Sequence, residues 1–472
     1  MELMERWAWY GLFSVLALYL TGSRDTGALG MTHIEKGQIM GYVTAILYLL
    51  PIITGVIADK IGFKLSLIIA YLMLITGYYA MGQVTTYWVV FFVFLYVAVG
   101  AALFKPVASA IVTISTDESN STLGFGIFYM MVNIGGFVGP AMSSTLRTKY
   151  GWHIIFIQAA TVIFINLLIV LFFYKNPKDY QPSREPLGKA IGTALKNIIE
   201  AVSDTRLSVL LLIMVGFWTM FNQLFYTLPT FIEDWVDTRA LHDSIAQVSP
   251  WLASAMSGGG DKVNPEMLIN IDAGAIIVLQ LFVSYLVLKL RPINAMITGF
   301  IIAIIGIGLT FYTHNGLYTI LGIIIFAIGE MMTNPTFSSF IALISPKGKE
   351  GLYMGTYFLP VFAGNFFTTF ISGNLYEAWS DKLSLLKKEM ASRGIDMPDV
   401  GGNFTKNDYF KLAAEKLGMS RTEMTQYLWD HYHPNRIWYV ICGIGIATVI
   451  ALYVYDKLVI QPRERRAAAN GE

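Results

Sequence analysis

The chain opens on the stretch MELMERWAWYG at residues 1–11, which leads into a long apolar run. Three charged side chains, Glu2, Glu5 and Arg6, lie within what is otherwise the pattern of a membrane-spanning helix. With Trp9 they occupy helical positions i, i+3, i+4 and i+7, so they share one face. Charges inside a membrane helix are costly and mark functional sites. We therefore predict that this face contacts protein or a water-filled cavity. The alternative is a first turn that lies at the membrane surface.

The composition is that of an integral membrane protein. Of 472 residues, 55% are hydrophobic, and the mean hydropathy is +0.55, which is far more apolar than a soluble protein of ordinary composition. The net charge of +1 gives no basic surplus of the kind that binds nucleic acid. The single cysteine, Cys442, excludes an internal disulfide.

Windows of about 20 apolar residues predict twelve membrane spans and hence an all-α fold. A polar segment, 175–206, divides them six and six. Within it, the amphipathic pattern of residues 187–203 predicts a linker helix, with a helix on the membrane surface as the alternative. We therefore expect one six-helix bundle over 1–174, a second over 207–459, and a tail over 460–472. The predicted spans are 2–21, 36–57, 65–82, 87–114, 124–146, 151–174, 207–231, 266–290, 293–312, 317–343, 351–376 and 436–459.

The distribution of Lys and Arg predicts that both termini are cytoplasmic. With the N-terminus inside, the inner connections and the tail hold sixteen of them and the outer connections before residue 378 hold six, as the positive-inside rule requires. The last outer segment, 378–434, has helical patterning of its own and is expected to form an extracytoplasmic cap. The inner residues are Lys60, Lys64, Lys175, Lys178, Arg184, Lys189, Lys196, Arg206, Lys289, Arg291, Lys347, Lys349, Lys457, Arg463, Arg465 and Arg466; the outer residues are Arg24, Lys36, Arg147, Lys149, Arg239 and Lys262.

Six plus six helices joined by an inner linker are typical of major facilitator transporters, which bind their substrate between two halves at the midplane. The loop GVIADKIGFK at 55–64 resembles the signature of that superfamily between its second and third helices. The resemblance implies that Asp59, Lys60 and Lys64 hold the inner helix ends together in one state. An ordinary polar loop that carries topology charges is the alternative.

Two further segments carry charge into predicted spans. In GAALFKP at 100–106, Lys105 lies about nine residues from the inner helix end, hence roughly 14 Å deep at 1.5 Å per residue. Pro106 should kink this helix and free a backbone carbonyl. In GEMMTNP at 329–335, Glu330 lies at the middle of a span, next to Pro335. A carboxyl at that depth must find a cation or take up a proton. A lysine that only closes a structural ion pair is the alternative for Lys105.

These segments together resemble the proton-coupled oligopeptide transporter family, a branch of the major facilitator superfamily. E-x-x-E-R with a following Tyr-Gly is similar to the first-helix motif of that family, GAALFKP to G-x-G-L-F-K-P, and GEMMTNP to G-E-x-x-x-S-P, with Asn334 at the serine position. The resemblance implies a transporter driven by protons. It implies a proton-coupling set of Glu2, Glu5, Arg6, Lys105 and Glu330.

Three other segments extend the resemblance along the chain. They are FYMMVNIGG at 128–136, FWTMFNQ at 217–223 and MGTYFL at 354–359, similar to the family patterns F-Y-x-x-I-N-x-G, F-W-x-x-F-E-Q and M-G-x-W-F-L. An amide such as that of Asn133 suits the backbone of a peptide-like ligand. The implied substrate-binding residues are Trp9, Tyr10, Phe13, Tyr48, Lys105, Asn133, Trp218, Asn222, Gln223, Asn270, Glu330 and Tyr357.

The chain also departs from the family pattern. Phe13 stands where peptide-transporting members have an arginine, and Asn222 stands where they have its acidic partner, so both halves of an ion pair are missing together. Trp9 replaces a tyrosine. Asn270 keeps the family asparagine, but the following proline is absent and Asp272 is added. We interpret Asp272 as an outer-surface residue at a helix start.

The sequence thus predicts a proton-driven importer of di- or tripeptides, or of peptide-like solutes, that works by alternating access. A carrier of nitrate or another organic anion, and a non-transporting sensor on the same fold, are the alternatives. We expect no enzyme, cofactor or metal site, because the six histidines fall in or beside predicted loops. We expect a monomer in the lipid bilayer of a bacterial cytoplasmic membrane, with protons and a small solute as its partners.

Overall fold

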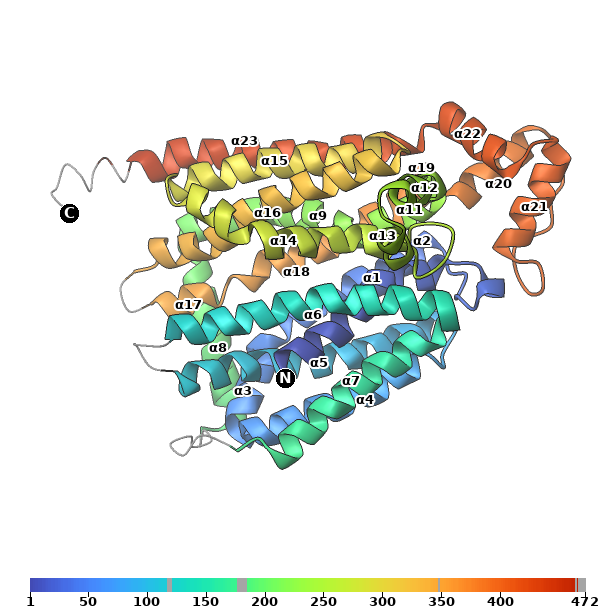
Figure 1. The fold of residues 1–472 in the computed structure, drawn as a ribbon. Helices are drawn as coiled ribbons and strands as arrows, with labels where there is room; N and C mark the ends of the chain where they lie inside the picture. Colours follow the sequence, from blue (N-terminus) through green and yellow to red (C-terminus); the bar gives the residue numbers. More distant parts are fainter. Residues whose placement is uncertain (117–120, 176–184, 347–348, 463–464, 466–472) are drawn as a thin grey trace.

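The computed structural model describes residues 1–116, 121–175, 185–346, 349–462 and 465. These residues form helices, turns and two isolated bridges, without a strand. Two helical bundles lie side by side: the first half of the chain, blue to teal in Figure 1, forms one, and the second half, green to red, forms the other. Among the predicted inner cations, Lys178, Arg184, Lys347, Arg463 and Arg466 lie outside the described residues, as does most of the predicted tail.

The first bundle contains one bent span. Its second span consists of α2 and α3, which meet at an angle of 49°. The bend falls at Pro51, the first residue of α3, because proline lacks the N–H that would continue α2. The helices of this bundle are α1 (Glu2–Thr21), α2 (His33–Leu49), α3 (Pro51–Ile61), α4 (Phe63–Met81), α5 (Tyr87–Ser115), α6 (Ser121–Tyr150) and α7 (His153–Phe172).

The second bundle has more interruptions. The predicted span 207–231 is divided into α9, α10 and α11, and the predicted span 351–376 into α17, α18, the π-helix η2 and α19. The helices are α9 (Thr205–Phe221), α10 (Gln223–Tyr226), α11 (Leu228–Trp235), α14 (Pro265–Val287), α15 (Pro292–Tyr312), α16 (Gly316–Ile344), α17 (Glu350–Met354), α18 (Phe358–Thr369), η2 (Phe370–Leu375), α19 (Tyr376–Trp379), α23 (Ile437–Tyr455) and η4 (Asp456–Ile460).

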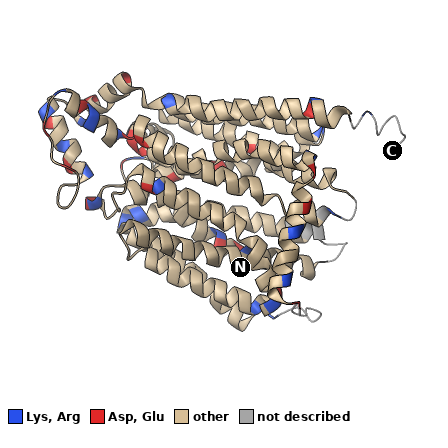
Figure 2. Cartoon of the chain, turned by 180° about the vertical axis from the view of Figure 1, so that it is seen from behind, with Lys and Arg blue, Asp and Glu red and all other residues tan. Residues whose placement is uncertain are grey.

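The helices identify a multi-pass membrane protein. In the described part of the chain, nine are long and apolar enough to cross a membrane, and the bent pair of α2 and α3 makes a tenth span. Helix α1 has the length of a span with 20 residues, but its charged first turns lower its mean hydropathy. Figure 2 shows that charged residues gather at the two ends of the bundles, whereas the middle is almost free of them.

Two helical additions mark the two ends of the molecule. Residues 382–432 form three helices beyond the bundles, α20 (Lys382–Ser392), α21 (Lys406–Leu417) and α22 (Arg421–Tyr432), which we call the cap. Leu386, Met390 and Leu428 of the cap are buried in the same apolar cluster as the core of the second bundle. Helix α8 (Leu187–Val202) lies at the opposite end, packed against α3 and α17. Leu195 and Ile199 of its apolar side are exposed. We call the two ends the cap end and the linker end (Figure 1).

The two bundles touch most closely at the cap end. There α2 of the first bundle packs against α18 and η2 of the second, and glycines bring the backbones together. A Cβ added at Gly37 would lie 2.8 Å from the Thr369 carbonyl oxygen, and one added at Gly41 would overlap the Thr369 hydroxyl. Arg147 on α6 also reaches across to Glu266 on α14, with Nη2 to Oε1 and Oε2 distances of 2.8 and 3.0 Å. The route between the bundles is therefore closed at the cap end in this structure.

Candidate functional site

A cavity of about 350 Å³ lies between the two bundles. Helices α1, α2, α5 and α6 contribute one wall, and α9, α10, α14, α16 and α18 contribute the other. Twelve of the predicted site residues line it: Arg6, Trp9, Tyr10, Phe13, Tyr48, Lys105, Asn133, Trp218, Asn222, Asn270, Glu330 and Tyr357. Residues as far apart in the sequence as Arg6 and Tyr357 thus converge on one space, because the helices fold into two facing bundles.

The charges at the start of α1 form a buried cluster at the edge of the cavity. Arg6 is 6% exposed and Glu5 is fully buried, and Arg6 Nε donates to Glu5 Oε2 at 2.6 Å. The same nitrogen lies 3.3 Å from Glu2 Oε1. One guanidinium therefore serves two carboxylates, and one oxygen of each carboxylate has no hydrogen-bond partner in the structure. A surface position for this turn, the alternative from the sequence, does not agree with this burial.

Helix α6 can approach the charged cluster because it presents glycines to α1. A Cβ at Gly135 would overlap the carbonyl oxygen of Leu3, and one at Gly139 would lie 2.5 Å from the carbonyl oxygen of Trp7. Such close backbone contact is what small residues permit between membrane helices. The glycines of the segment 128–136 therefore have a packing role.

Lys105 lies on the same wall, one helix away. Its Nζ lies 4.4 Å from the centre of the Tyr48 ring, in the geometry of a cation–π contact. Pro106 leaves the carbonyl of Ala102 without its helical donor, and the Thr54 hydroxyl donates to that carbonyl at 2.7 Å. This bond accounts for the carbonyl that the sequence predicted to be free. It ties α3 to α5 directly behind Lys105.

The opposite wall carries Glu330 and a polar pair next to it. Tyr357 Oη donates to Asn334 Oδ1 at 2.6 Å, one turn beyond Glu330 on α16. Pro335 lies inside this helix. Glu330 Oε2 is buried and has no hydrogen-bond partner in the structure. Asn334, which replaces the serine of the family pattern, thus holds the side chain of Tyr357 in place.

The structure corrects our interpretation of Asp272. This residue is not at an outer helix start: α14 begins at Pro265, so Asp272 lies two turns inside the helix, 5% exposed, and lines the cavity. The predicted span began at 266, one residue from the observed start, so the error was to assign Asp272, six positions further on, to the helix end. Asn270 orients this wall by donating from Nδ2 to the Phe137 carbonyl of α6 at 2.9 Å.

Aromatic rings line the part of the cavity nearest α1. Trp9 stacks on Phe13 with ring centres 5.5 Å apart, and Phe13 meets the edge of Tyr226 at 5.5 Å. The Trp218 Nε1 and Asn222 Nδ2 atoms are buried donors without a partner in the structure. This end of the cavity therefore offers apolar faces and unused donors instead of an ion pair.

Not every predicted residue reaches the cavity. Gln223 is fully buried and does not line it, because its Nε2 donates to the Thr219 carbonyl and its Oε1 accepts from Thr227. At the linker end, Asp59 and Lys60 line a separate small hollow with residues of α8, and Lys64 Nζ donates to the Leu171 carbonyl at 3.2 Å. Their gating role stays a prediction.

Some residues that line the cavity were not predicted from the sequence. Tyr226 Oη donates to Asn365 Oδ1 at 2.7 Å, and this hydrogen bond joins α10 to α18 at the cavity. The backbone carbonyl of Tyr129 accepts a hydrogen bond from Asn133 Nδ2. Helical spacing gave a usable signal, since Tyr129 and Tyr226 lie four positions from Asn133 and Asn222 and so on the same helix faces. Asn365 has no predicted site residue three or four positions away, so helical spacing did not indicate it.

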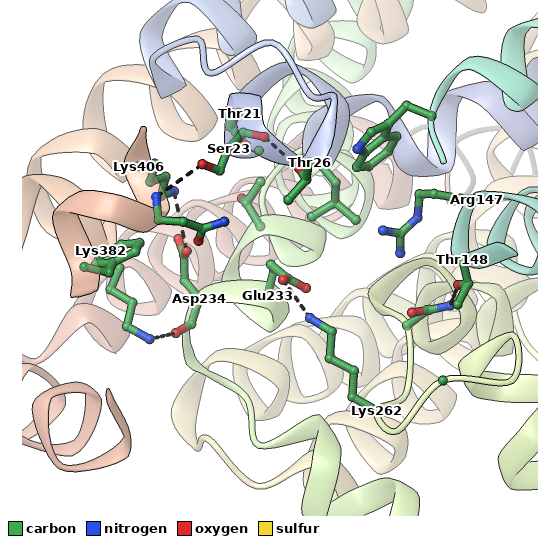
Figure 3. Close-up of a pocket in the computed structure, with 18 of the residues that line it drawn as sticks. Thr21, Ser23, Thr26, Arg147, Thr148, Glu233, Asp234, Lys262, Lys382 and Lys406 are labelled. Atoms are coloured by element: carbon green, nitrogen blue, oxygen red, sulfur yellow. Dashed lines mark hydrogen bonds and ion pairs between the residues drawn. The ribbon is translucent and has the colours of Figure 1, made fainter. Parts of the chain in front are cut away.

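A second hollow, of about 560 Å³, lies at the cap end. Lys406 of the cap lies 3.9 Å from Oδ1 of both Asp234 and Asp381, and Lys382 Nζ donates to the Asp234 carbonyl at 2.9 Å. Figure 3 shows both lysines at Asp234, and Lys262 at Glu233. The hollow therefore contains its own ion pairs.

His33 connects the first bundle to Asp381, the residue directly before the cap, because its Nε2 lies 3.3 Å from Asp381 Oδ1. Burial alone would raise the pKa of Asp381, but the imidazole of His33 and the ammonium of Lys406 outweigh it and hold this pKa well below its usual range. His33, Asp234 and Asp381 each place a ligand atom within 4.8 Å of the others. Because Lys406 already supplies the positive charge, these residues fit an internal ion network better than a metal ion.

Comparisons with known proteins agree with this architecture. A family profile described as Major Facilitator Superfamily matches residues 2–369. Uncharacterized transporter YclF of Bacillus subtilis is 29% identical over 209 residues, 43% of this chain and 42% of that protein. Dipeptide and tripeptide permease A of Escherichia coli is 27% identical over 233 residues, 47% of this chain and 43% of that protein. These alignments thus cover less than half the length of either relative.

Solved structures share the fold over nearly the whole chain. The peptide transporter POT in complex with sulfate superimposes with a TM-score of 0.67 and 18% identity, covering 98% of this chain and 93% of that one. The nucleoside transporter NupG gives a TM-score of 0.66 and 14% identity, covering 96% and 97%. At such identities the likeness shows the fold alone. The family match and the two facing bundles lead to one conclusion: this chain belongs to the major facilitator superfamily and has its fold.

Proposed function

We propose that the protein is a proton-driven importer of di- or tripeptides, or of peptide-like solutes, that works by alternating access. One observation carries the proposal: the cavity between the bundles has Lys105 on one wall and Glu330 on the other, next to the buried Glu2, Glu5 and Arg6 cluster. A small zwitterion needs opposite charges on opposite walls. A proton-coupled carrier also needs buried carboxyls that change charge.

The cavity suits a short peptide in size and chemistry. Its volume is within the range of roughly 300–1,000 Å³ that is usual for small-molecule sites. Lys105 supplies a cation for a ligand carboxylate, and Asn133, Asn222 and Asn270 supply amide groups for a peptide backbone. The similarity to dipeptide and tripeptide permease A supports the same substrate class.

The coupling mechanism follows from the shared guanidinium. Arg6 is the common partner of Glu2 and Glu5, so a proton on either carboxyl changes how strongly the other one binds Arg6. We infer that this exchange, together with a proton on Glu330, sets the balance between the open and closed states at each end. Protons entering down their gradient would then drive the solute inward.

The positive-inside count supports a cytoplasmic linker end and an external cap end. On that orientation, the closed contacts of α2 with α18 and η2 seal the outer side, and the state described is the one that loads or releases on the cytoplasmic side. We propose the cytoplasmic membrane of a bacterium as the location, with both termini inside.

We expect that Gly41→Leu stops transport by preventing closure at the cap end. Even a Cβ at this position overlaps the Thr369 hydroxyl, and overpacking a tight contact costs roughly 1–3 kcal/mol, so uptake should fall about tenfold or more. The matched control is Gly443→Leu on α23, where an added Cβ meets nothing within 4 Å. Uptake per amount of protein in the membrane is the measurement. Normal uptake by Gly41→Leu would show that this contact never has to close.

The missing ion pair of the family gives a second expected result. Phe13→Arg alone should impair uptake, because it buries a cation without a partner. Phe13→Arg with Asn222→Glu should restore the pair and favour ordinary free-acid dipeptides, since a planar guanidinium binds a carboxylate better than one ammonium does. Both positions are 7% exposed and line the cavity from facing helices.

A double-mutant cycle on dipeptide affinity measures the coupling between these two positions. We expect a coupling of about 1–3 kcal/mol in favour of the double variant. Strict additivity would mean that the two side chains do not meet across the cavity.

Uptake of a labelled dipeptide library into liposomes with an imposed pH gradient tests the proposed function. We expect accumulation of some library members only when the outside is acidic. Accumulation of nitrate instead of any dipeptide would favour the anion carrier, and accumulation of neither would favour the sensor.

A further inference from the structure

Two carboxyl groups of the second bundle face the central cavity side by side. Asp272 comes from α14 and Glu330 from α16, two helices that pack against each other, and both side chains line the cavity. Only Glu330 has a counterpart in the family patterns that the sequence resembles, so Asp272 adds a second acid to this wall.

Neither carboxyl is neutralised by the protein. Neither forms an ion pair with a Lys, Arg or His in the described part of the chain, and Asp272 Oδ1 and Glu330 Oε2 are buried without a hydrogen-bond partner. Asn270 adds a third unused acceptor, because its Nδ2 is engaged by Phe137 while its Oδ1 has no partner. Buried acceptors of this kind are normally paired, so these three oxygens are open to donors from a ligand.

The two cations that line the cavity, Arg6 and Lys105, are on the opposite wall. Arg6 is held between Glu2 and Glu5, and Lys105 lies over the Tyr48 ring. The wall formed by α14 and α16 therefore has two acidic groups and no basic one among the cavity-lining residues that the structure describes.

A ligand with one ammonium group can neutralise only one of these two acids. The other must then keep a proton or remain an isolated charge in a water-poor space. A ligand with two cationic groups can pair with both. Packed helix axes lie about 8–10 Å apart, and the flexible four-carbon stem of lysine places a second ammonium within reach of the neighbouring helix.

We propose that Asp272 and Glu330 form a two-carboxyl subsite for dicationic ligands, so that peptides with a basic first residue are the favoured substrates of this carrier. The α-ammonium group and the side-chain cation of such a residue each pair with one carboxyl. This inference rests on the proposed function, because it names the substrate class of the same cavity. Asp272 is the residue that determines the specificity.

Isothermal titration calorimetry on the purified full-length chain in detergent tests the proposal. Lysyl-alanine is compared with norleucyl-alanine, which has the same kind of straight side chain without the charge. We expect lysyl-alanine to bind at least about tenfold more tightly than norleucyl-alanine, because its second cation adds a hydrogen bond between charged groups. Asp272→Asn should reduce this ratio to about two or less, whereas Glu415→Gln, at an exposed acid of the cap, should leave it unchanged.

Equal affinities of the two dipeptides for the unaltered protein would overturn the proposal, whatever the variants do. A ratio that survives in Asp272→Asn would overturn it as well, since another residue would then bind the second cation. Cadaverine and pentylamine, which have no carboxylate or peptide bond, separate the subsite from the peptide function. If no dipeptide binds, but cadaverine binds more tightly than pentylamine and does so only when Asp272 is present, the two-carboxyl subsite is supported and the peptide function is contradicted. If neither a dipeptide nor cadaverine binds, both fail.

Discussion

Gradient-driven uptake should be abolished in Glu5→Gln and in Arg6→Ala, while both variants remain folded. Glu5 is fully buried and accepts from Arg6 at 2.6 Å, so the neutral amide removes a titratable group and weakens a buried ion pair. Arg6→Ala leaves Glu2 and Glu5 without their shared cation, and both must then hold protons. Because Arg6 contacts both carboxylates, either change alters the whole cluster and should stop the proton cycle. We expect uptake to fall by about 100-fold, which is the size of a coupling free energy of about 3 kcal/mol between two sites.

Counterflow separates coupling from binding in these variants. Exchange of labelled for unlabelled substrate needs no proton gradient, so Glu5→Gln should keep it. The matched control is Glu200→Gln, which breaks an exposed ion pair to Lys349 at the linker end and should leave uptake within about twofold. Concentrative uptake at the normal rate in both cluster variants would remove the coupling role from this cluster.

Lys105→Ala should weaken the binding of free-acid dipeptides much more than that of their C-terminal amides. Lys105 is the cavity cation that is not held by a carboxylate within hydrogen-bond distance in the described structure, since its contact is the Tyr48 ring at 4.4 Å. A hydrogen bond to a charged group contributes about 1.5–3 kcal/mol. Affinity for the free acid should therefore fall about 10–100-fold, and affinity for the amide only a few-fold.

The amide series is the internal control for this result, because it keeps the ligand shape and removes only the carboxylate. Lys196→Ala, at an exposed lysine of α8 at the linker end, controls for the loss of a positive charge elsewhere. Equal losses for acids and amides would assign Lys105 to the support of the helix or to proton coupling.

The sequence predicted the fold because membrane spans leave a clear pattern. Each of the twelve predicted spans contains a helix or a series of helices. The sequence did not predict where these spans are interrupted. Pro51 divides the second span into α2 and α3, and the seventh span becomes α9, α10 and α11. A hydropathy window averages over such breaks, and in a membrane neighbouring helices satisfy the backbone groups that they free.

The site was predictable where a charge interrupts an apolar run. Lys105 and Glu330 stand out for that reason, and both line the cavity. Asp272 was equally visible, and the predicted helix start at 266 was within one residue of the observed start at Pro265. The error was to assign a residue six positions along that helix to its outer end, although the packing of α14 against α16 places it at the cavity. Tyr226 and Asn365 meet across two helices, and no pattern within either helix reveals which residues of the other it faces.

The central claim is that solute and protons move together through the cavity between the two bundles. Its most direct test is a measurement of internal pH in liposomes that contain the purified protein and a trapped pH indicator, without an imposed proton gradient. A transported dipeptide is then added outside. The account predicts that the lumen acidifies as the peptide enters, that lysyl-alanine is among the peptides that cause this, and that Glu5→Gln admits peptide without acidification. Peptide entry without any change of internal pH in the unaltered protein would contradict it.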